Sequence, residues 1–267
     1  MEMHRSAVHT PNFISAPTAP QKAQRAGLPS ERLPFTIRRV AGEDSLRKAV
    51  GIRHAAYARH VPEFARSLAV PEVSDYDEDT VVLIAESKLD GSALGTARIR
   101  TNIYQPLHIE ESVVLPAWLQ GRRLGEVERL GVAEGRIGHM VKVALVKAFF
   151  EYFENEGIEW AVIAGRTPID RQYEQLMFTD VFGEKEMVPL RHTGNILHRV
   201  MAFEIATGEE RWRAAKHPLL KFFRETHHPD IDLGKQAPER EAQRAPQAPR
   251  LPQRGGHGSV AQRLILT

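Results

Sequence analysis

The chain has 267 residues, of which 42% are hydrophobic, so it can bury a sizeable core in one large domain or two small ones. It contains no cysteine, which excludes a disulfide framework and a thiolate zinc site. The formal net charge of +2 is uneven: residues 1–33 carry +2 and residues 233–267 carry +4, which leaves −4 for the middle. A basic nucleic-acid-binding core is therefore not expected.

Two flanking segments are rich in Pro, Ala and Gln and show no hydrophobic periodicity. We expect residues 1–33 and 233–267 to be disordered basic tails around one domain at residues 34–232. No apolar run reaches the roughly 18 residues of a membrane span, and the first residues lack an apolar signal core. We therefore expect no transmembrane segment and a cytoplasmic location.

Between the tails, hydrophobic patterns typical of strands and helices alternate. In chain order they predict a strand at Phe35–Val40, a helix at Glu43–Arg59, an irregular loop at 60–79, strands at Thr80–Glu86 and Ala93–Arg100 joined by an Asp90-Gly91 turn, a long connection at 102–124, a strand at Glu126–Val132, a helix at Gly135–Glu156, a strand at Glu159–Ala164, a helix at Asp170–Met177, strands at 180–190 and 198–206, and a helix at Glu209–His227. This order predicts an α/β (α+β) fold with a mixed, mostly antiparallel central sheet flanked by helices.

Charged and aromatic residues recur beside these elements in an order that suggests one ionic site. Arg98 and Arg129 stand among apolar neighbours, where an unpaired charge is costly, so carboxylate partners are expected. On a regular strand Glu126 and Glu128 share one face and Arg129 lies on the other. From the residues alone, structural salt bridges around a flexible loop are the simpler interpretation and a functional site is the alternative. The set comprises Arg53, Tyr57, Asp75, Asp77, Arg98, Glu126, Glu128 and Arg129.

The strand Glu126–Val132, a glycine-bearing turn and the long helix follow one another directly. This sequence of elements resembles the GCN5-related N-acyltransferase superfamily, in which the N-terminal amides of the helix receive a pantetheine-linked acyl donor. The resemblance implies that fold and a donor site at Val132, Gly135, Arg136 and Gly138. Unpaired N–H groups at a helix start do attract phosphate and carbonyl oxygens, although an ordinary helix start is the alternative.

The ordered charged residues resemble the N-acyl homoserine lactone (autoinducer) synthases. That pattern is Arg-x-x-x-Phe, an Asp-x-x-Asp-type acidic pair, an arginine on the next strand, and Glu-x-Ser/Thr-Arg. Here Arg53 with Tyr57, Asp75 with Asp77, Arg98, and Glu126 to Arg129 take these places. Three departures (Tyr57 for Phe, Glu128 for Ser/Thr, and Phe64 as the nearest aromatic to an expected Trp) weaken the autoinducer assignment. The chain more closely resembles the related long-chain N-acyl amino acid synthases, which also tend to end with a segment like His228-Pro229-Asp230.

The resemblance implies an N-acyltransferase that moves a fatty acyl chain to the α-amine of an amino acid. Coenzyme A-using members of the superfamily typically carry Gln/Arg-x-x-Gly-x-Gly/Ala at this turn, and the spacing of Arg136 and Gly138 does not match it. The expected donor is therefore phosphopantetheine on acyl-carrier protein. No other cofactor and no metal are expected. Alternatives are an autoinducer synthase, a coenzyme A-dependent acetyltransferase, and a non-catalytic carrier-binding module.

The residues divide into roles under this interpretation. Glu126 is the first candidate for the base, Glu128 the second, and Arg98 and Arg129 orient them or hold the acceptor carboxylate. The remaining members of the set, Arg53, Tyr57, Asp75 and Asp77, would order the early helix and loop over the acceptor. We further expect Phe149, Ile163 and aromatic residues of the last helix to help line an acyl slot. Finally, Arg122, Arg123, Lys142 and Lys147 are either solvated surface or a basic patch for acidic acyl-carrier protein.

Overall fold

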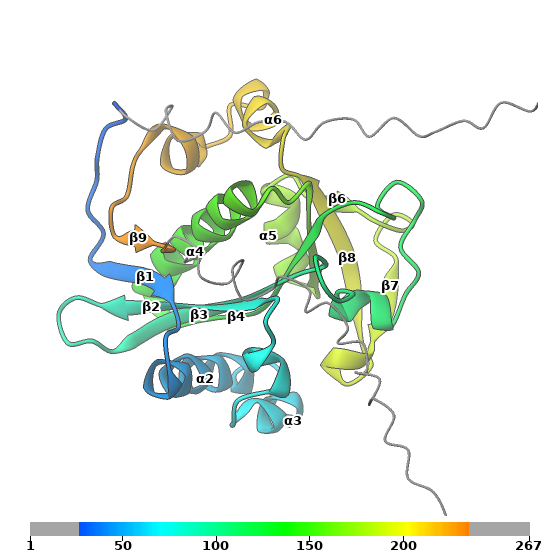
Figure 1. Cartoon of the computed structure of the whole chain (residues 1–267), viewed down its shortest axis with the longest axis horizontal. Coiled ribbons are helices and arrows are strands. Elements are labelled where there is room, and N and C mark those ends of the chain that lie inside the picture. The colour runs from blue at the N-terminus through cyan, green and yellow to red at the C-terminus, as the bar shows by residue number, and fades with distance from the viewer. Residues whose placement is uncertain (1–26, 235–267) are drawn as a thin grey trace, which may run out of the picture. The chain divides into compact units, whose positions relative to one another are not determined.

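The computed structural model describes residues 27–234, so most of both predicted tails lies outside the described residues. Within this range nine strands form one sheet in the order β6-β8-β5-β4-β3-β2-β1-β9, and β7 also pairs with β8 (Figure 1). The strands are β1 (Phe35–Arg39), β2 (Thr80–Ser87), β3 (Ala93–Thr101), β4 (Leu124–Val132), β5 (Trp160–Gly165), β6 (Thr179–Asp180), β7 (Met187–Leu190), β8 (Ile196–Glu204) and β9 (Ile231–Asp232). The β4–β5 and β1–β9 pairs are parallel and the others antiparallel, which confirms the predicted mixed, mostly antiparallel sheet.

Helices cover both faces of this sheet, as the alternation of elements predicted. Helix α2 lies against one face and helix α4 against the other (Figure 1). The α-helices are α2 (Glu43–Ala58), α3 (Pro62–Ala65), α4 (Gly135–Glu156), α5 (Ile169–Gln175) and α6 (Gly208–Ala214). The shorter helical turns are η1 (Arg66–Leu68), η2 (Val73–Tyr76), η3 (His108–Glu111), η4 (Arg191–Thr193) and the π-turn η5 (Lys221–Glu225). No helix in the described range is long and apolar enough to cross a membrane.

The main core lies between the sheet and α4. The apolar stripe of α4 is buried, and the helix ends at Gly157, whose φ of 64° is the left-handed conformation of a glycine C-cap. Phe150 contacts the rings of Phe203 and Trp212 edge to face, with centroids 5.1 and 5.0 Å away. Residues 219–223 also pack here, so α6 and η5 are held onto α4 by aromatic burial.

The opposite face is covered by α2 and by the connection before β4. Gly131 lets α2 approach β4 closely, since a Cβ there would lie 3.0 Å from the Cβ of Ala56. The connection at residues 102–124 builds a second hydrophobic cluster against β5 and β8, with Leu107, Ile109 and Leu119 fully buried. This segment is therefore part of the folded body, although its sequence shows no regular period.

Several predicted elements are divided in the structure. The expected strand at 180–190 is two short strands, β6 and β7, and the expected helix at Glu209–His227 is α6 followed by a turn and η5. The expected loop at 60–79 contains α3, η1 and η2. The folded part of the described chain also includes residues before 34: Ser30 pairs with His227, and Leu33 is buried and donates its N–H to Asp230.

We predict that Gly125→Ala destabilises the protein by about 1–3 kcal/mol, because a rigid core has to yield to the new methyl group. A Cβ at Gly125 would lie 2.1 Å from the ring of Phe153, which is fully buried. The matched control is Gly51→Ala in α2, where no atom lies within 4 Å of the new Cβ. The control should raise the free energy of unfolding by about 0.5–1 kcal/mol, measured by urea unfolding. Equal effects of the two variants would contradict the packing argument.

Candidate active site

Strands β3 and β4 present their polar side chains in pairs across the sheet. Arg98 stands opposite Glu128, and Arg100 stands opposite Glu126. All four side chains are buried, with exposed fractions between 0% and 8%. The segments before β2 and before β4 cover them, so the site is an enclosed layer of charge rather than a solvated face.

A β-bulge places Arg129 in the same layer. Thr96 pairs with Gly131 and Arg98 with Glu128, so one residue of β3 opposes two of β4. Arg129 has a φ of 54°, a conformation rare for residues other than glycine. The expectation that Arg129 points to the opposite face from Glu128 is therefore wrong: its Nη1 lies 4.0 Å from Glu128 Oε2.

Three guanidinium groups converge on Glu72, the residue that precedes η2. Arg129 holds it in a fork, with Nε 2.8 Å from Oε2 and Nη2 2.7 Å from Oε1. Arg53 and Arg98 each donate to the same Oε2, at 3.1 and 3.0 Å. Burial alone would raise the pKa of Glu72, but Arg129 and the other two arginines lower it. Glu72 was not among the residues predicted from the sequence.

Asp75 completes the carboxylate side of this cluster, as predicted. Its two oxygens accept from Arg53 at 2.8 and 2.9 Å, and Arg98 donates to one of them at 3.1 Å. The Asp75 side chain also accepts the N–H of Glu72 at 2.8 Å, which ties the two acids together. The pKa of Asp75 is lowered, because these arginines outweigh the effect of burial. Glu72 and Asp75 are three residues apart, as in the Asp-x-x-Asp-type pair of the autoinducer synthases. Asp75 and Asp77 are only two residues apart and do not match that spacing.

Asp77 belongs to a neighbouring chain of contacts and not to the Arg53 cluster. It accepts from Arg100 at 2.7 Å, and the same Arg100 nitrogen lies 3.3 Å from Nε2 of His108. The other ring nitrogen of His108 lies 2.7 Å from Glu128. Asp77 therefore reaches the site only through Arg100 and His108.

Aromatic rings close one side of the cluster. The guanidinium of Arg129 lies over Phe64 at 5.2 Å, and the ring of Tyr57 is 6.0 Å from that of Phe64. Burial raises the pKa of Tyr57, so its hydroxyl is neutral beside the arginines. Phe64, the nearest aromatic to the expected Trp, thus covers Arg129.

The surroundings of the two glutamates of β4 shift their pKa values in opposite directions. Burial raises the pKa of Glu126 well above its usual range, and the nearby charge of Glu128 raises it further. Burial would do the same to Glu128, but Arg98, His108 and Arg129 lower its pKa well below the usual value. The surroundings therefore favour the ionised form of Glu128 and the protonated form of Glu126.

Two histidines that sequence reasoning did not select stand beside these acids. His108 and His192 stack with ring centroids 5.6 Å apart, and His192 Nε2 lies 3.7 Å from Glu126 Oε1. Both come from short helical turns without sequence periodicity, so no local pattern marks them. His108, Glu126 and Glu128 lie within 4.8 Å, close enough to share a metal ion, but two guanidinium groups already stand beside Glu128. We assign no metal site, and the absence of a metal stays a prediction.

The predicted donor turn borders a hollow of about 690 Å³ at the start of α4. Val132, Gly135 and Gly138 line it, whereas Arg136 does not. Gly138 is required there, because a Cβ would lie 1.8 Å from the carbonyl oxygen of Ala133. Arg59 of the α2 end holds the strand side by donating to the Val132 carbonyl at 2.6 Å. The donor role of these residues stays a prediction.

Strands β4 and β5 separate between the ionic cluster and this hollow. Their pairing runs from Leu124–Trp160 to Val127–Ile163, and β4 then continues for five residues without β5 as a partner. The backbone of Glu128–Val132 therefore offers hydrogen-bonding groups that no β5 ladder satisfies. Phe149 and Ile163, which were expected to line an acyl slot, are buried in the main core.

The four basic residues that were considered as either solvated surface or a basic patch do not gather around the hollow. Lys147 is buried and bonds the carbonyls of Phe222 and Thr226, so it anchors the C-terminal segment. Arg122 and Arg123 bond Glu159 and the carbonyl of Glu156, at the far end of α4. Lys142 alone of the four borders the hollow.

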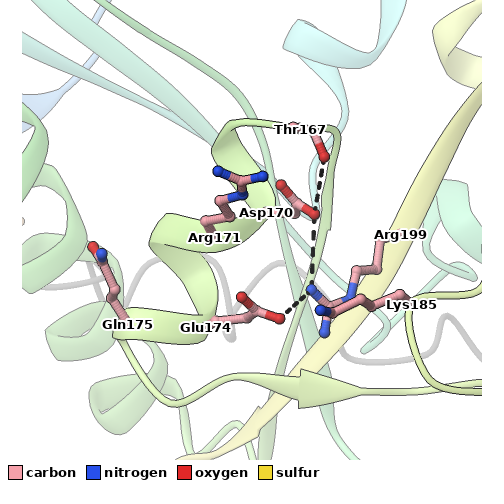
Figure 2. Close-up of a pocket in the computed structure, with 7 residues that line it drawn as sticks. All are labelled: Thr167, Asp170, Arg171, Glu174, Gln175, Lys185 and Arg199. Atoms are coloured by element: carbon pink, nitrogen blue, oxygen red, sulfur yellow. Dashed lines mark hydrogen bonds and ion pairs between the residues drawn. The ribbon is translucent and has the colours of Figure 1, made fainter.

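A second hollow lies beside α5, and Figure 2 shows its polar lining. Arg199 is its buried centre, bonded to Glu174 at 2.6 Å and also to Asp180. Asp170 and Thr167 stand above this pair, with Asp170 3.8 Å from Arg199. The charges of Arg199 are thus satisfied within the chain, and we give this hollow no role in the chemistry.

The chain was compared with known proteins. No protein-family model matches it, and no curated protein sequence matches it significantly. FeeM, an N-acyl amino acid synthase from uncultured soil microbes, has a similar structure, with a TM-score of 0.52 and 18% identity over 70% of this chain and 96% of that chain. This chain has the GCN5-related N-acyltransferase fold. BjaI, a coenzyme A-dependent acyl-homoserine lactone synthase, is found at a TM-score of 0.49 and 18% identity over 75% of this chain and 95% of that chain.

We predict that Asp75→Asn lowers the free energy of unfolding by about 3–5 kcal/mol, because it leaves buried arginines short of a negative partner. Arg53 and Asp75 both have fully buried side chains. The control is Asp77→Asn, whose carboxylate is 29% exposed and should cost much less. Urea unfolding at neutral pH measures both, and a loss from Asp75→Asn no larger than the control would contradict the assigned burial cost.

Acid should weaken the fold through the same carboxylates. The folded-state pKa values of Glu72, Asp75 and Glu128 are lowered, so their stabilisation is complete above the unfolded values of about 4 and is lost as pH falls through the folded values. We predict that the free energy of unfolding falls below about pH 4.5, and falls less in Asp75→Asn. Urea titrations at stepped pH test this, and a wild-type stability that stays flat in acid would refute it.

Proposed function

We propose that this chain is an N-acyltransferase that moves a fatty acyl chain from acyl-carrier protein to the α-amine of an amino acid. The observation that carries the proposal is the position of the ionic cluster. Arg98, Glu128 and Arg129 are buried where β4 leaves β5, and the donor hollow begins at the end of the same strand. Acyl transfer to an amine needs these elements together: a group that takes a proton, donors that polarise a carbonyl, and an opening for the thioester.

The structure supports an orienting role for the arginines. The fork of Arg129 is filled by Glu72, and Arg98 already bonds Glu72, Asp75 and Glu128. To bind these arginines, an acceptor carboxylate would have to displace one of these acids. An orienting role, in which the arginines hold Glu128 and the covering segment, keeps the existing ion pairs. We therefore assign Arg53, Arg98 and Arg129 to holding the acidic groups in place.

Glu126 remains our candidate for the base, acting directly or through a water molecule. It is 1% exposed, and one oxygen accepts the N–H of Ile109 at 3.2 Å. Its raised pKa gives a carboxyl that gains and loses a proton nearer to neutral pH, which is what a general base for an amine requires. Glu128, bonded to Arg98 and His108, is too well paired to be the better base.

The test is product formation by the full chain with acyl-carrier thioesters of several lengths and a panel of amino acids. We predict an N-acyl amino acid by mass spectrometry, and a rate reduced about 10²–10⁴-fold in Glu126→Gln. The control is Glu159→Gln, which removes an exposed surface pair with Arg122 and should keep the full rate.

Other outcomes decide between the alternatives. A lactone formed from S-adenosylmethionine would identify an autoinducer synthase, and turnover with acyl-coenzyme A alone would replace the carrier as donor. Carrier binding without any product would identify a non-catalytic module. Full activity in Glu126→Gln would remove the role assigned to that residue.

A further inference from the structure

The side chains of His192 and Glu126 form a buried pair that has no hydrogen bond to the arginines of the ionic cluster. His192 Nε2 lies 3.7 Å from Glu126 Oε1, and the exposed fractions of the two side chains are 8% and 1%. The other ring nitrogen of His192 is buried and has no hydrogen-bond partner in the described chain. The backbone of His192 is fixed, since its carbonyl accepts from Arg129 Nη2 at 2.8 Å.

Charged and titratable groups face this pair from each neighbouring element. These are Glu128 and Arg129 from β4, Arg98 and Arg100 from β3, the stacked ring of His108 from η3, and His198 from β8. Burial, together with Arg129 and both histidines, lowers the pKa of His192 to about 4, although Glu128 opposes this. The imidazole is therefore neutral at neutral pH, and the surroundings of Glu126 favour its protonated form.

We propose that Glu126 and His192 share a single proton, and that His192 is a positioning residue which takes this proton when the Glu126 carboxylate is needed. The transfer from Oε1 to Nε2 leaves the net charge of the buried site unchanged, so Glu128 and the arginines keep their pairing. A protonated Glu126 without such a neighbour would have to release its proton to water across a closed layer of side chains.

The role in turnover rests on the proposed acyltransferase function. With the proton on His192, the Glu126 carboxylate accepts the proton that the attacking amine loses as its nitrogen bonds to the acyl carbon. The carbon–sulfur bond breaks, and the leaving thiolate takes up one of the two protons that the pair then holds. The pair then holds one proton again, and the products are an amide and a neutral thiol.

Proton sharing can be measured without turnover. We expect the ring ¹⁵N signals of His192, followed by NMR from about pH 5 to about pH 9, to shift in a step when Glu126 loses its proton. That step should vanish in Glu126→Gln, while the His198 signals titrate alike in both proteins. A His192 titration that is the same in wild type and Glu126→Gln would overturn the proposal.

The kinetic arm uses His192→Gln, which keeps a polar side chain but cannot hold the proton, with His198→Gln as the control. We expect at least a tenfold lower rate at neutral pH that recovers partly at higher pH, because Glu126 then loses its proton to solvent. His198→Gln should stay within about twofold of wild type. A loss in His192→Gln by the same factor at every pH, or no loss, would overturn the relay. If wild type forms no N-acyl product, the proposed function fails, and the NMR step still decides whether the proton is shared.

Discussion

The structure depends on one carboxylate, that of Glu72, which bonds three buried guanidinium groups, while Asp75 and Glu128 supply further negative charge. Removing an arginine from water costs several kcal/mol unless hydrogen-bonded opposite charge replaces the solvent. Arg53, Arg98 and Arg129 are at most 3% exposed, and Glu72 bonds each of them. Glu72 lies in a segment of short turns with little apolar burial. The arginines on α2, β3 and β4 therefore hold residues 60–79 in place, and residues 60–79 in turn cover the arginines.

The bulge in β4 makes this convergence possible. On a regular strand Arg129 would point away from Glu128 and leave the fork to Glu72 unformed. The left-handed backbone at Arg129 has a conformational cost, which the fork to Glu72 and the contact with Phe64 offset. The same stretch of β4 has no β5 partner, so the gathered charges lie beside backbone groups that no β5 ladder satisfies.

Hydrophobic periodicity predicted the sheet and the long helix α4, because both depend on local spacing. The pairing of the buried arginines was predicted from the cost of an isolated charge among apolar neighbours. Glu72, His108 and His192 were missed because they lie in short turns whose course is set by tertiary contacts. The bulge at Arg129 was also invisible, since a period-2 pattern contains no sign of an inserted residue. The predicted helix at Glu209–His227 failed for a related reason: its aromatic residues meet α4 through a turn and a π-turn instead of one continuous face.

The spacing along β4 also limits where the proposed reaction takes place. Val132, at the donor hollow, is six residues beyond Glu126, or about 20 Å along a strand, which is too far for direct proton transfer. The backbone at Glu128–Leu130 is much nearer to Glu126 and lacks a β5 partner. On the proposed function, the pantetheine arm therefore extends from the hollow toward the bulge, and the thioester carbonyl is polarised there instead of at the helix start. This position sets the reacting carbon beside Glu128 and Glu126, whose pKa values are shifted in opposite directions by their different partners on one strand face.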